Sequence, residues 1–202
     1  MRIIAGSRKG ARIFTPAAGT RPTGDRVREA AFNLIGPVDG ASVLDLFAGS
    51  GALGLEALSR GAESAAFVES DREACRTIKR NLDKLQLTGA TVLCRDALAA
   101  LAAEAAAGRR YDLVLADPPY EMFSQLQAAL AAYLPAVLAE NGLLVVETDA
   151  RTEPELPLVK RTSRRYGSAR LTLFEHSSRS ASGGGGAGLC PAVAHAGEGR
   201  EE

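Results

Sequence analysis

The sequence predicts an α/β fold, in which helices flank a mostly parallel β-sheet that ends in an antiparallel hairpin. Three observations lead to this fold class. Short apolar runs alternate with helical stretches between residues 41 and 150, a glycine-rich turn follows the first run, and leucines alternate with polar residues around 157–174. Strand–helix alternation with short connections produces right-handed βαβ units and an open parallel sheet.

Each expected strand is a short apolar run of the kind that a parallel sheet buries on both faces. The strands are expected at Ser42–Leu46, Ala65–Glu69, Thr91–Cys94, Leu113–Ala116 and Leu143–Glu147. The helices between them are expected at Ala52–Ser59, Arg72–Leu85, Ala97–Ala107 and Phe123–Leu138. Asp71 can cap the second helix, and Asn141-Gly142 can end the fourth. Residues 157–174 add two antiparallel strands at the sheet edge, which makes a seven-stranded sheet.

Residues 1–40 form an N-terminal extension in front of this alternation. Arg2–Ala5 and Ala11–Phe14 flank residues 6–10, so a β-hairpin with a basic tip is expected. A helix is expected from Asp25 to Ile35, with an apolar face formed by Val27, Ala30, Ala31 and Leu34.

One domain is expected over residues 41–176, with this extension before it and a tail after it. Residues 177–202 contain four consecutive glycines and no Phe, Tyr, Ile or Met. Such a segment cannot bury enough apolar surface to offset its ordering entropy, so a disordered low-complexity tail is expected.

The formal net charge is zero, from 24 basic and 24 acidic residues, which taken alone argues against a strongly basic nucleic-acid-binding protein. The charge is unevenly distributed along the chain, however. Residues 1–40 carry +4, 41–150 carry −6, 151–176 carry +3 and 177–202 carry −1. Either these sums reflect scatter on solvated faces, or the basic segments face an anion that the acidic middle does not touch.

Membrane, secreted and metal-binding classes are not favoured. No apolar run approaches the ~18 residues needed to span a bilayer, and the N-terminus lacks the apolar stretch of a secretory signal, so a cytoplasmic protein is expected. Cys75, Cys94 and Cys190 are too scattered for a disulfide framework or a zinc site, so no metal is expected. Cys75 and Cys94 are interpreted as small core residues.

The first strand ends in a turn that is typical of nucleotide-binding sites. Gly49, Gly51 and Gly54 match G-x-G-x-x-G, which alone also fits a dinucleotide site or a simple tight turn. Asp45 precedes the turn by four residues, and its carboxylate would pair with a ligand's ammonium group rather than with a pyrophosphate. Glu69 ends the second strand, 20 residues beyond Gly49, and can accept hydrogen bonds from both hydroxyls of a ribose.

A third acid, Asp96, follows the third strand. It can accept a hydrogen bond from the exocyclic amine of an adenine or cap the next helix, and the two roles are compatible. Because the carboxyl ends of parallel strands meet at one edge of the sheet, the three acids are expected to line one crevice.

The segment Asp117-Pro118-Pro119-Tyr120 follows the fourth strand. The two prolines prevent a helix and offer no N–H, so the loop presents acceptors only, the Asp117 carboxylate and the Pro118 carbonyl. Such a pocket suits an amine that donates two hydrogens, and the ring of Tyr120 offers a stacking surface for a base. Asp117 can also stabilise the positive charge that develops when a base amine is methylated. The structural alternative is a proline-rich turn with a capping Asp.

These motifs resemble those of the class I S-adenosyl-L-methionine (SAM)-dependent methyltransferases that act on amino groups. Asp-Pro-Pro-Tyr is the form shared by adenine-N6 and guanine-N2 enzymes. Over residues 1–175 the sequence resembles the RsmD family, which methylates N2 of one guanine in bacterial 16S rRNA. The segments that carry this closer resemblance are Arg2–Gly6, Arg21–Thr23, Asp25–Asn33 and Leu44–Gly61.

The resemblance implies a Rossmann-like class I methyltransferase fold, SAM as the cofactor, and 16S rRNA in an assembled or assembling 30S subunit as the partner of a monomer. Gly49, Ser50 and Gly51 would pass under the methionine moiety of SAM, Glu69 would hold the ribose, and Asp96 with Ala97 would face the adenine. Asp117, Pro118 and Tyr120 would hold the target guanine. The segment Arg21–Thr23 would close over the carboxylate end of the cofactor, with Thr23 as a cofactor ligand.

A base in a duplex must be flipped out, or must lie in a loop, before it can enter such a pocket. Arg8, Lys9 and Arg12 on the expected hairpin, together with Arg21, are the candidates for contacts with RNA phosphates. Three alternatives stay open: an adenine-N6 DNA methyltransferase, a nicotinamide-dependent reductase and a non-catalytic RNA-binding assembly factor. Asp45 and the two-proline loop argue against the reductase.

Overall fold

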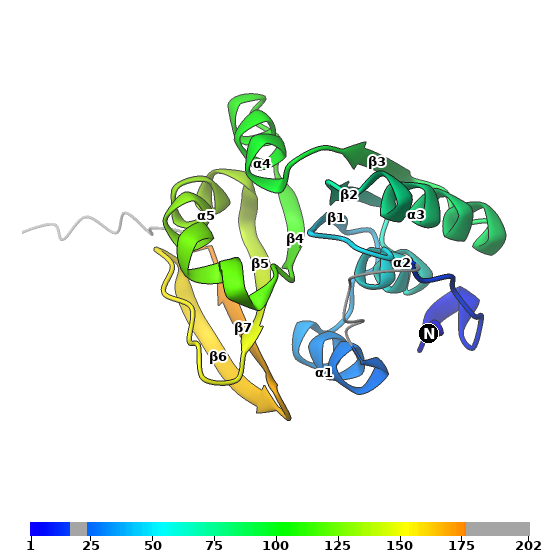
Figure 1. Cartoon of the computed structure of the whole chain (residues 1–202), viewed down its shortest axis with the longest axis horizontal. Coiled ribbons are helices and arrows are strands. Elements are labelled where there is room, and N and C mark those ends of the chain that lie inside the picture. Colours follow the sequence, from blue (N-terminus) through cyan, green and yellow to red (C-terminus); the bar gives the residue numbers. More distant parts are fainter. Residues whose placement is uncertain (17–23, 177–202) are drawn as a thin grey trace, which may run out of the picture.

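The computed structural model describes residues 1–16 and 24–176, and Figure 1 shows them as one β-sheet with helices on both faces. Within the described residues, seven strands lie in the order β3-β2-β1-β4-β5-β7-β6. They are β1 (Ser42–Leu46), β2 (Ser64–Glu69), β3 (Ala90–Cys94), β4 (Tyr111–Ala116), β5 (Leu138–Asp149), β6 (Val159–Tyr166) and β7 (Ala169–Glu175). Strands β1 to β5 pair in parallel, and β7 runs antiparallel to both β5 and β6. The predicted fold class is confirmed.

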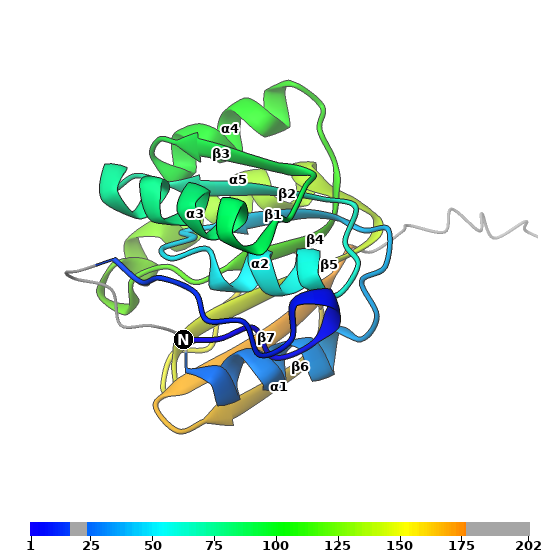
Figure 2. The same ribbon diagram turned by 90° about the vertical axis from the view of Figure 1, so that its right-hand side faces the viewer.

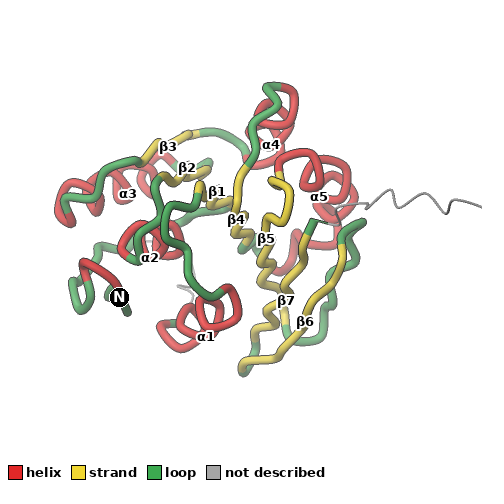
Figure 3. Tube along the Cα trace, turned by 180° about the vertical axis from the view of Figure 1, so that it is seen from behind, coloured by secondary structure: helices red, strands yellow, loops and turns green. Residues whose placement is uncertain are grey.

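Helices cover the sheet in two layers, which Figure 3 shows on either side of the strands. One face carries α1 (Asp25–Ile35), α2 (Ala52–Ser59) and α3 (Arg72–Leu85), and the other carries α4 (Ala97–Ala106) and α5 (Phe123–Val137). Two short 3₁₀ helices are η1 (Gly6–Arg8) and η2 (Tyr120–Met122). Val43 of β1 packs into the apolar cluster under α1–α3, and its neighbour Leu44 into the cluster under α4 and α5. Burial on both faces explains why the strands read as continuous apolar runs.

Helices α1, α2 and α3 match the expected boundaries at both ends, but the stop predicted at Asn141-Gly142 is wrong. Helix α5 ends at Val137, because Leu138 turns to extended backbone. Asn141 lies inside β5 with a φ of 64°. An irregular register between β4 and β5 accommodates these residues, so β5 begins before the predicted strand.

The predicted N-terminal hairpin is wrong in its extent. The segment forms one antiparallel bridge, between Arg2 and Arg12, and no strand. The backbone N–H groups of Ile4 and Ala5 donate to the carboxylate of Glu56 on α2, at 2.8 and 2.9 Å, instead of to a facing strand. The N-terminal segment therefore lies against α2, as Figure 2 shows.

Of the two cysteines interpreted as core residues, Cys75 is buried and Cys94 is exposed, so the interpretation is wrong for Cys94. Cys94 ends β3, an edge strand that has a neighbour on one side only. The predicted tail at 177–202, together with Arg21 and Thr23, lies outside the described residues. No helix in the described part of the chain is long and apolar enough to cross a membrane.

A buried ion pair joins the N-terminal segment, α1 and α2. The side chains of Arg28 and Glu56 are both fully buried, and Arg28 Nε lies 3.7 Å from Glu56 Oε2. Glu56 also accepts a hydrogen bond from Arg60 Nε at 2.8 Å. Arg28 donates through Nη2 to the carbonyl of Arg2 and to the carboxylate of Asp25. Apolar residues of the first 40 belong to the same cluster as α2 and α3, so this segment shares one core with the sheet.

We expect Glu56→Ala to destabilise the protein by about 3–5 kcal/mol, because it removes the buried counter-charge of the Arg28 guanidinium and leaves only the half-exposed Asp25. Urea unfolding monitored by circular dichroism measures the loss. Glu29→Ala is the matched control, since Glu29 is exposed on α1, and its effect should stay within about 0.5 kcal/mol. Equal effects of the two substitutions would show that the buried pair adds nothing.

Candidate active site

The carboxyl ends of β1 and β4 lie side by side where the strand order reverses. Strands β2 and β3 continue the sheet beyond β1, and β5 and β7 continue it beyond β4. Leu46 of β1 and Ala116 of β4 are partners in the register. The turn after β1 and the loop after β4 therefore leave the sheet at the same level. In open α/β sheets, ligands bind in the crevice at such a switch point.

The turn after β1 uses backbone conformations that favour glycine. Gly49 and Gly51 have φ values of 54° and 78°, and Phe47 has a φ of 61°, which is unusual for an aromatic residue. A Cβ on Gly49 would meet no atom within 4 Å, so this corner of the turn faces open space. A Cβ on Gly54 would lie 2.4 Å from the ring of Phe67. The first two glycines shape the turn, and the third lets α2 pack closely on the sheet.

The carboxylate of Asp45 lies beneath this turn. Asp45 is 1% exposed, and its Oδ2 accepts a hydrogen bond from the N–H of Gly54 at 2.9 Å. The pKa of Asp45 is raised to about 7, chiefly by burial; the Gly54 N–H opposes this rise, and the carboxylates of Asp117 and Glu69 add to it. A cation bound in the crevice would favour the ionised form of this carboxyl group.

Glu69 connects the end of β2 to the glycine turn. Its Oε2 accepts from the N–H of Gly49 and its Oε1 from the N–H of Asp71, both at 2.8 Å. Each carboxylate oxygen has two lone pairs, so Glu69 keeps acceptor capacity for further donors.

Asp96 lies at the same edge of the sheet, after β3. It caps α4, as expected, by accepting from the N–H of Ala99 at 2.9 Å. Asp96 is exposed, so its remaining acceptor capacity is accessible, and Ala97 is buried at the first position of the helix. The structure thus brings all three predicted acids to one edge of the sheet.

The loop after β4 begins with the half-buried Asp117 and the buried Pro118. Tyr120 follows at the start of η2, and its hydroxyl donates to Oε1 of Glu147 at 2.9 Å. Because Asp117 contributes to the raised pKa of Asp45, the loop and the glycine turn share one electrostatic environment.

Glu147 is a residue of this site that the sequence motifs did not single out. It is 7% exposed on β5, one position after Val146, which pairs with Ala116 of β4. It lines a small cavity together with Ala31 of α1 and Leu53 of α2. Its position in the sequence could have indicated it. Glu147 ends the apolar run 143–147, as Glu69 ends the apolar run of the second strand.

The N-terminal segment reaches the glycine turn through Asn81 of α3. The fully buried Asn81 donates from Nδ2 to the carbonyls of Phe14 and Ser50, at 3.0 and 3.2 Å, and its Oδ1 accepts from the N–H of Phe14 at 2.8 Å. Ser50 Oγ lies 3.9 Å from the sulfur of Met1. The residues that precede the segment 17–23 therefore lie beside the turn.

Of the predicted RNA ligands in the N-terminal segment, Arg8 lies away from the glycine turn. The N–H of Arg8 donates to Ser59 Oγ at 3.0 Å, at the last residue of α2, about 12 Å along the helix axis from the glycine turn. The Nη2 of Arg8 donates to the carbonyl of Gln86 at the C-cap of α3. Lys9 and Arg12 are exposed. Arg8 thus attaches the segment to two helices.

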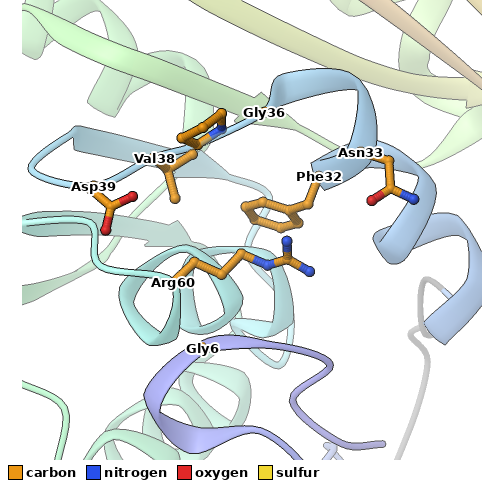
Figure 4. A pocket seen from close by; sticks show the side chains of 8 residues that line it. Gly6, Phe32, Asn33, Gly36, Val38, Asp39 and Arg60 are labelled. Carbon is orange, nitrogen blue, oxygen red and sulfur yellow. The ribbon is translucent and has the colours of Figure 1, made fainter.

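A hollow of about 440 Å³ lies at the other edge of the sheet, near the end of α2 and the start of β1. Its lining residues are Gly6, Phe32, Asn33, Gly36, Pro37, Val38, Asp39 and Arg60. Figure 4 shows the Arg60 guanidinium over the Phe32 ring, 4.6 Å from its centroid. Since none of the three acids lines this hollow, we attribute it to packing between α1 and α2 rather than to the site.

The carboxyl edge of the sheet suits an organic ligand that donates hydrogen bonds. Among residues 1–16 and 24–176, no group of three His, Cys, Asp or Glu side chains could hold a metal ion. Asp45, Glu69 and Asp96 offer acceptors at three successive strand ends, and a bound cation would favour the ionised form of Asp45. SAM carries matching groups: an ammonium group, two ribose hydroxyls and an adenine amine.

Comparisons with known proteins agree on one family. The family model described as Conserved hypothetical protein 95 matches residues 1–175. The protein YlbH of Bacillus subtilis is 44% identical over 186 residues, covering 87% of this chain and 98% of that protein. The ribosomal RNA small subunit methyltransferase D of Escherichia coli K12 is 39% identical over 161 residues, covering 79% of each chain.

Solved structures share the fold. The yhhF protein of Escherichia coli superposes with a TM-score of 0.75 at 34% identity, over 87% of this chain and 97% of that one. A more distant structure, SMU.776 complexed with SAH, has a TM-score of 0.64 at 16% identity, over 74% of this chain and 48% of that one, and supports the fold alone.

We expect the stability of the ligand-free protein to fall as pH rises through the titration of Asp45. The carboxyl group ionises near 3.8 in the unfolded chain and near 7 in the folded one, so between these values the folded state binds the extra proton. From pH 5 to pH 8 the loss should be about 2–3 kcal/mol larger in wild type than in Asp45→Asn. Urea unfolding at both pH values measures the difference.

Asp39→Asn is the control for this experiment, because Asp39 is exposed. It should keep the wild-type pH dependence. If Asp45→Asn also keeps it, then Asp45 is ionised in the folded protein throughout this range.

Proposed function

The chain belongs to the family of the ribosomal RNA small subunit methyltransferase D proteins, and on this premise we propose that it methylates the exocyclic N2 amine of one guanine in 16S rRNA. SAM is the methyl donor. The substrate is the RNA in an assembled or assembling 30S subunit, and the protein acts as a monomer in the cytoplasm.

The main support for this proposal is the position of two loops. The Asp117–Tyr120 loop and the glycine turn leave the adjacent strands β4 and β1 at the same level. A cofactor held at the turn and a base held by the loop would then meet in one crevice. Methyl transfer needs this proximity, because it is a direct displacement between two bound reactants.

On the cofactor side, the residues of the chain act as acceptors and as a shaped surface. The open corner at Gly49 leaves room for the methionine moiety, and the buried Asp45 carboxylate pairs with its ammonium group. Glu69 and Asp96 accept from the ribose hydroxyls and the adenine amine, with the capacity that their N–H contacts leave free. When bound, SAM supplies an electrophilic methyl group on a sulfonium.

On the substrate side, the loop holds and activates the amine. The lone pair of a guanine amine is delocalised into the ring, which makes the nitrogen a poor nucleophile. Asp117 and the Pro118 carbonyl accept its two hydrogens, draw the nitrogen toward a tetrahedral geometry and localise the pair. As the new C–N bond forms and the bond between the methyl group and the sulfonium sulfur breaks, positive charge develops on the nitrogen until a proton passes to water. The Asp117 carboxylate stabilises that charge.

Tyr120 supplies the surface against which the base stacks. Its hydroxyl donates to the buried Glu147, so the ring is fixed before a base arrives. A ring held in this way loses little freedom on binding, and stacking on it does not depend on which base is present. The ring therefore positions a base without selecting guanine over adenine.

We expect Asp117→Ala to lower kcat by about 10²–10³-fold, the usual effect of removing one preorganised group that stabilises transition-state charge. The assay incubates protein and SAM with small ribosomal subunits from cells that lack the enzyme, and mass spectrometry identifies the modified nucleoside. SAM affinity, measured by calorimetry, should stay close to that of wild type. An unchanged turnover would remove Asp117 from the catalytic role.

The identity of the product tests the proposed function itself. N2-methylguanosine supports it. N6-methyladenosine would redirect the activity to the adenine-N6 enzymes, and wild-type protein that binds RNA but yields no methylated nucleoside would favour the non-catalytic assembly factor.

We expect Tyr120→Ala to lower kcat/KM for RNA by about tenfold or more, since stacking of one base on an aromatic ring contributes roughly 1–3 kcal/mol. Tyr120→Phe keeps the ring and loses only the hydrogen bond to Glu147, so its effect should be clearly smaller. Steady-state kinetics with both variants measures this order. Equal losses in the two variants would mean that the hydroxyl, and not the ring, serves the reaction.

A further inference from the structure

The outer face of α3 carries a row of basic side chains. Arg72, Arg76, Arg80 and Lys84 recur every four residues, and all four are exposed. Residues at this spacing lie on one ridge of a helix surface, and at 1.5 Å per residue the row is about 18 Å long. Like charges at this spacing repel each other, so intrahelical stability does not account for the row.

The row begins beside the crevice. Helix α3 follows β2 directly, and its N-cap, Asp71, donates its N–H to the carboxylate of Glu69. At the other end, Arg8 Nη2 donates to the carbonyl of Gln86, the C-cap of α3. The guanidinium of Arg8 therefore continues the line of positive charge from the crevice toward the N-terminal segment.

Part of the row is held in place by an aromatic ring. The Arg80 guanidinium lies 3.6 Å and the Lys84 ammonium 4.5 Å from the centroid of the Phe14 ring. Phe14 is itself fixed by two hydrogen bonds to the buried Asn81, which also donates to the carbonyl of Ser50 in the glycine turn. The same side chain thus supports the row and the crevice.

The positive charge of the row is largely uncompensated. Among the described residues, the side chains of Arg72 and Arg76 form no ion pair, hydrogen bond or ring contact. The acids on α3 are Glu73 in the first turn, where it complements the helix dipole, and Asp83. Lys79 adds a further exposed base to the same face.

We propose that this row on α3, continued by Arg8, is the surface on which the phosphate backbone of the RNA substrate docks. The inference rests on the proposed function and adds to it the path that the RNA takes to the crevice. Charge complementarity selects the occupant: a line of exposed bases about 18 Å long that starts at the catalytic crevice fits a polyanion with regularly spaced charges.

The test uses the double variant Arg72→Gln/Arg76→Gln. It removes two charges whose side chains form no ion pair, hydrogen bond or ring contact in the described part of the protein. Binding of the protein to 16S rRNA is measured by filter binding between 50 and 300 mM KCl. Each lost phosphate contact lowers the slope of log K against log[salt] by about 0.7 for single strands, so the slope should fall by about 1–2 and affinity at 0.1 M salt by roughly tenfold or more. SAM affinity should stay unchanged.

The matched control is Arg164→Gln/Arg165→Gln, because both arginines are exposed and lie on β6, at the opposite edge of the sheet from β3 (Figure 1). It should leave slope and affinity close to wild type. A wild-type slope in the α3 variant, or an equal loss in the control, would overturn the docking surface. Loss of the slope in the α3 variant combined with no methylation by wild type would overturn the proposed reaction and leave the docking surface standing.

Discussion

The buried carboxylate of Glu56 is the contact on which the architecture around the active site depends. It accepts from two backbone N–H groups of the N-terminal segment and from Arg60, and it faces the fully buried Arg28 of α1. Removing two charges from water is expensive. The hydrogen bonds that Glu56 accepts offset part of this cost, whereas Nε and Nη1 of Arg28 are buried without a hydrogen-bond partner among the described residues. The two hydrogen bonds to Glu56 hold the segment against α2, and the same path brings Phe14 to Asn81 and the glycine turn.

A second constraint comes from the concentration of carboxylates at the carboxyl edge of the sheet. Asp45 is buried, and its pKa is raised by that burial and by its neighbours Asp117 and Glu69. Such a cluster is least stable when every member is ionised and no cation is present. Binding of a positively charged ligand relieves this repulsion, so the same feature that weakens the ligand-free protein at high pH strengthens its preference for a cation. Repulsion among these carboxylates would therefore account both for the lower stability at high pH and for a preference for cationic ligands.

The sequence was sufficient for the fold class and for the strand-end acids, because both follow from local rules. Buried parallel strands are apolar on both faces, and their carboxyl ends share one edge, so Asp45, Glu69 and Asp96 could be placed together without coordinates. The extent of the N-terminal hairpin could not be predicted, because the N–H groups of Ile4 and Ala5 pair with Glu56, about 50 residues away in the sequence. The hydrogen bond between Tyr120 and Glu147 could not be predicted either, because it joins the loop after β4 to β5, 27 residues away in the sequence.

The net charge of a stretch of sequence does not show where its charged side chains lie on the folded protein. Residues 41–150 carry a net −6, so the sum along the chain points to the flanking segments for contacts with RNA. The structure separates the charges of that middle segment: the acids at the strand ends lie at the carboxyl edge of the sheet, and the bases of α3 lie on an outer helical face. A polyanion binds to the charges that one surface presents. Salt screens its interaction with exposed charges more than about 10 Å away at 0.1 M ionic strength. The acidic crevice and the basic row can therefore belong to one segment and still bind a cationic cofactor and an anionic RNA.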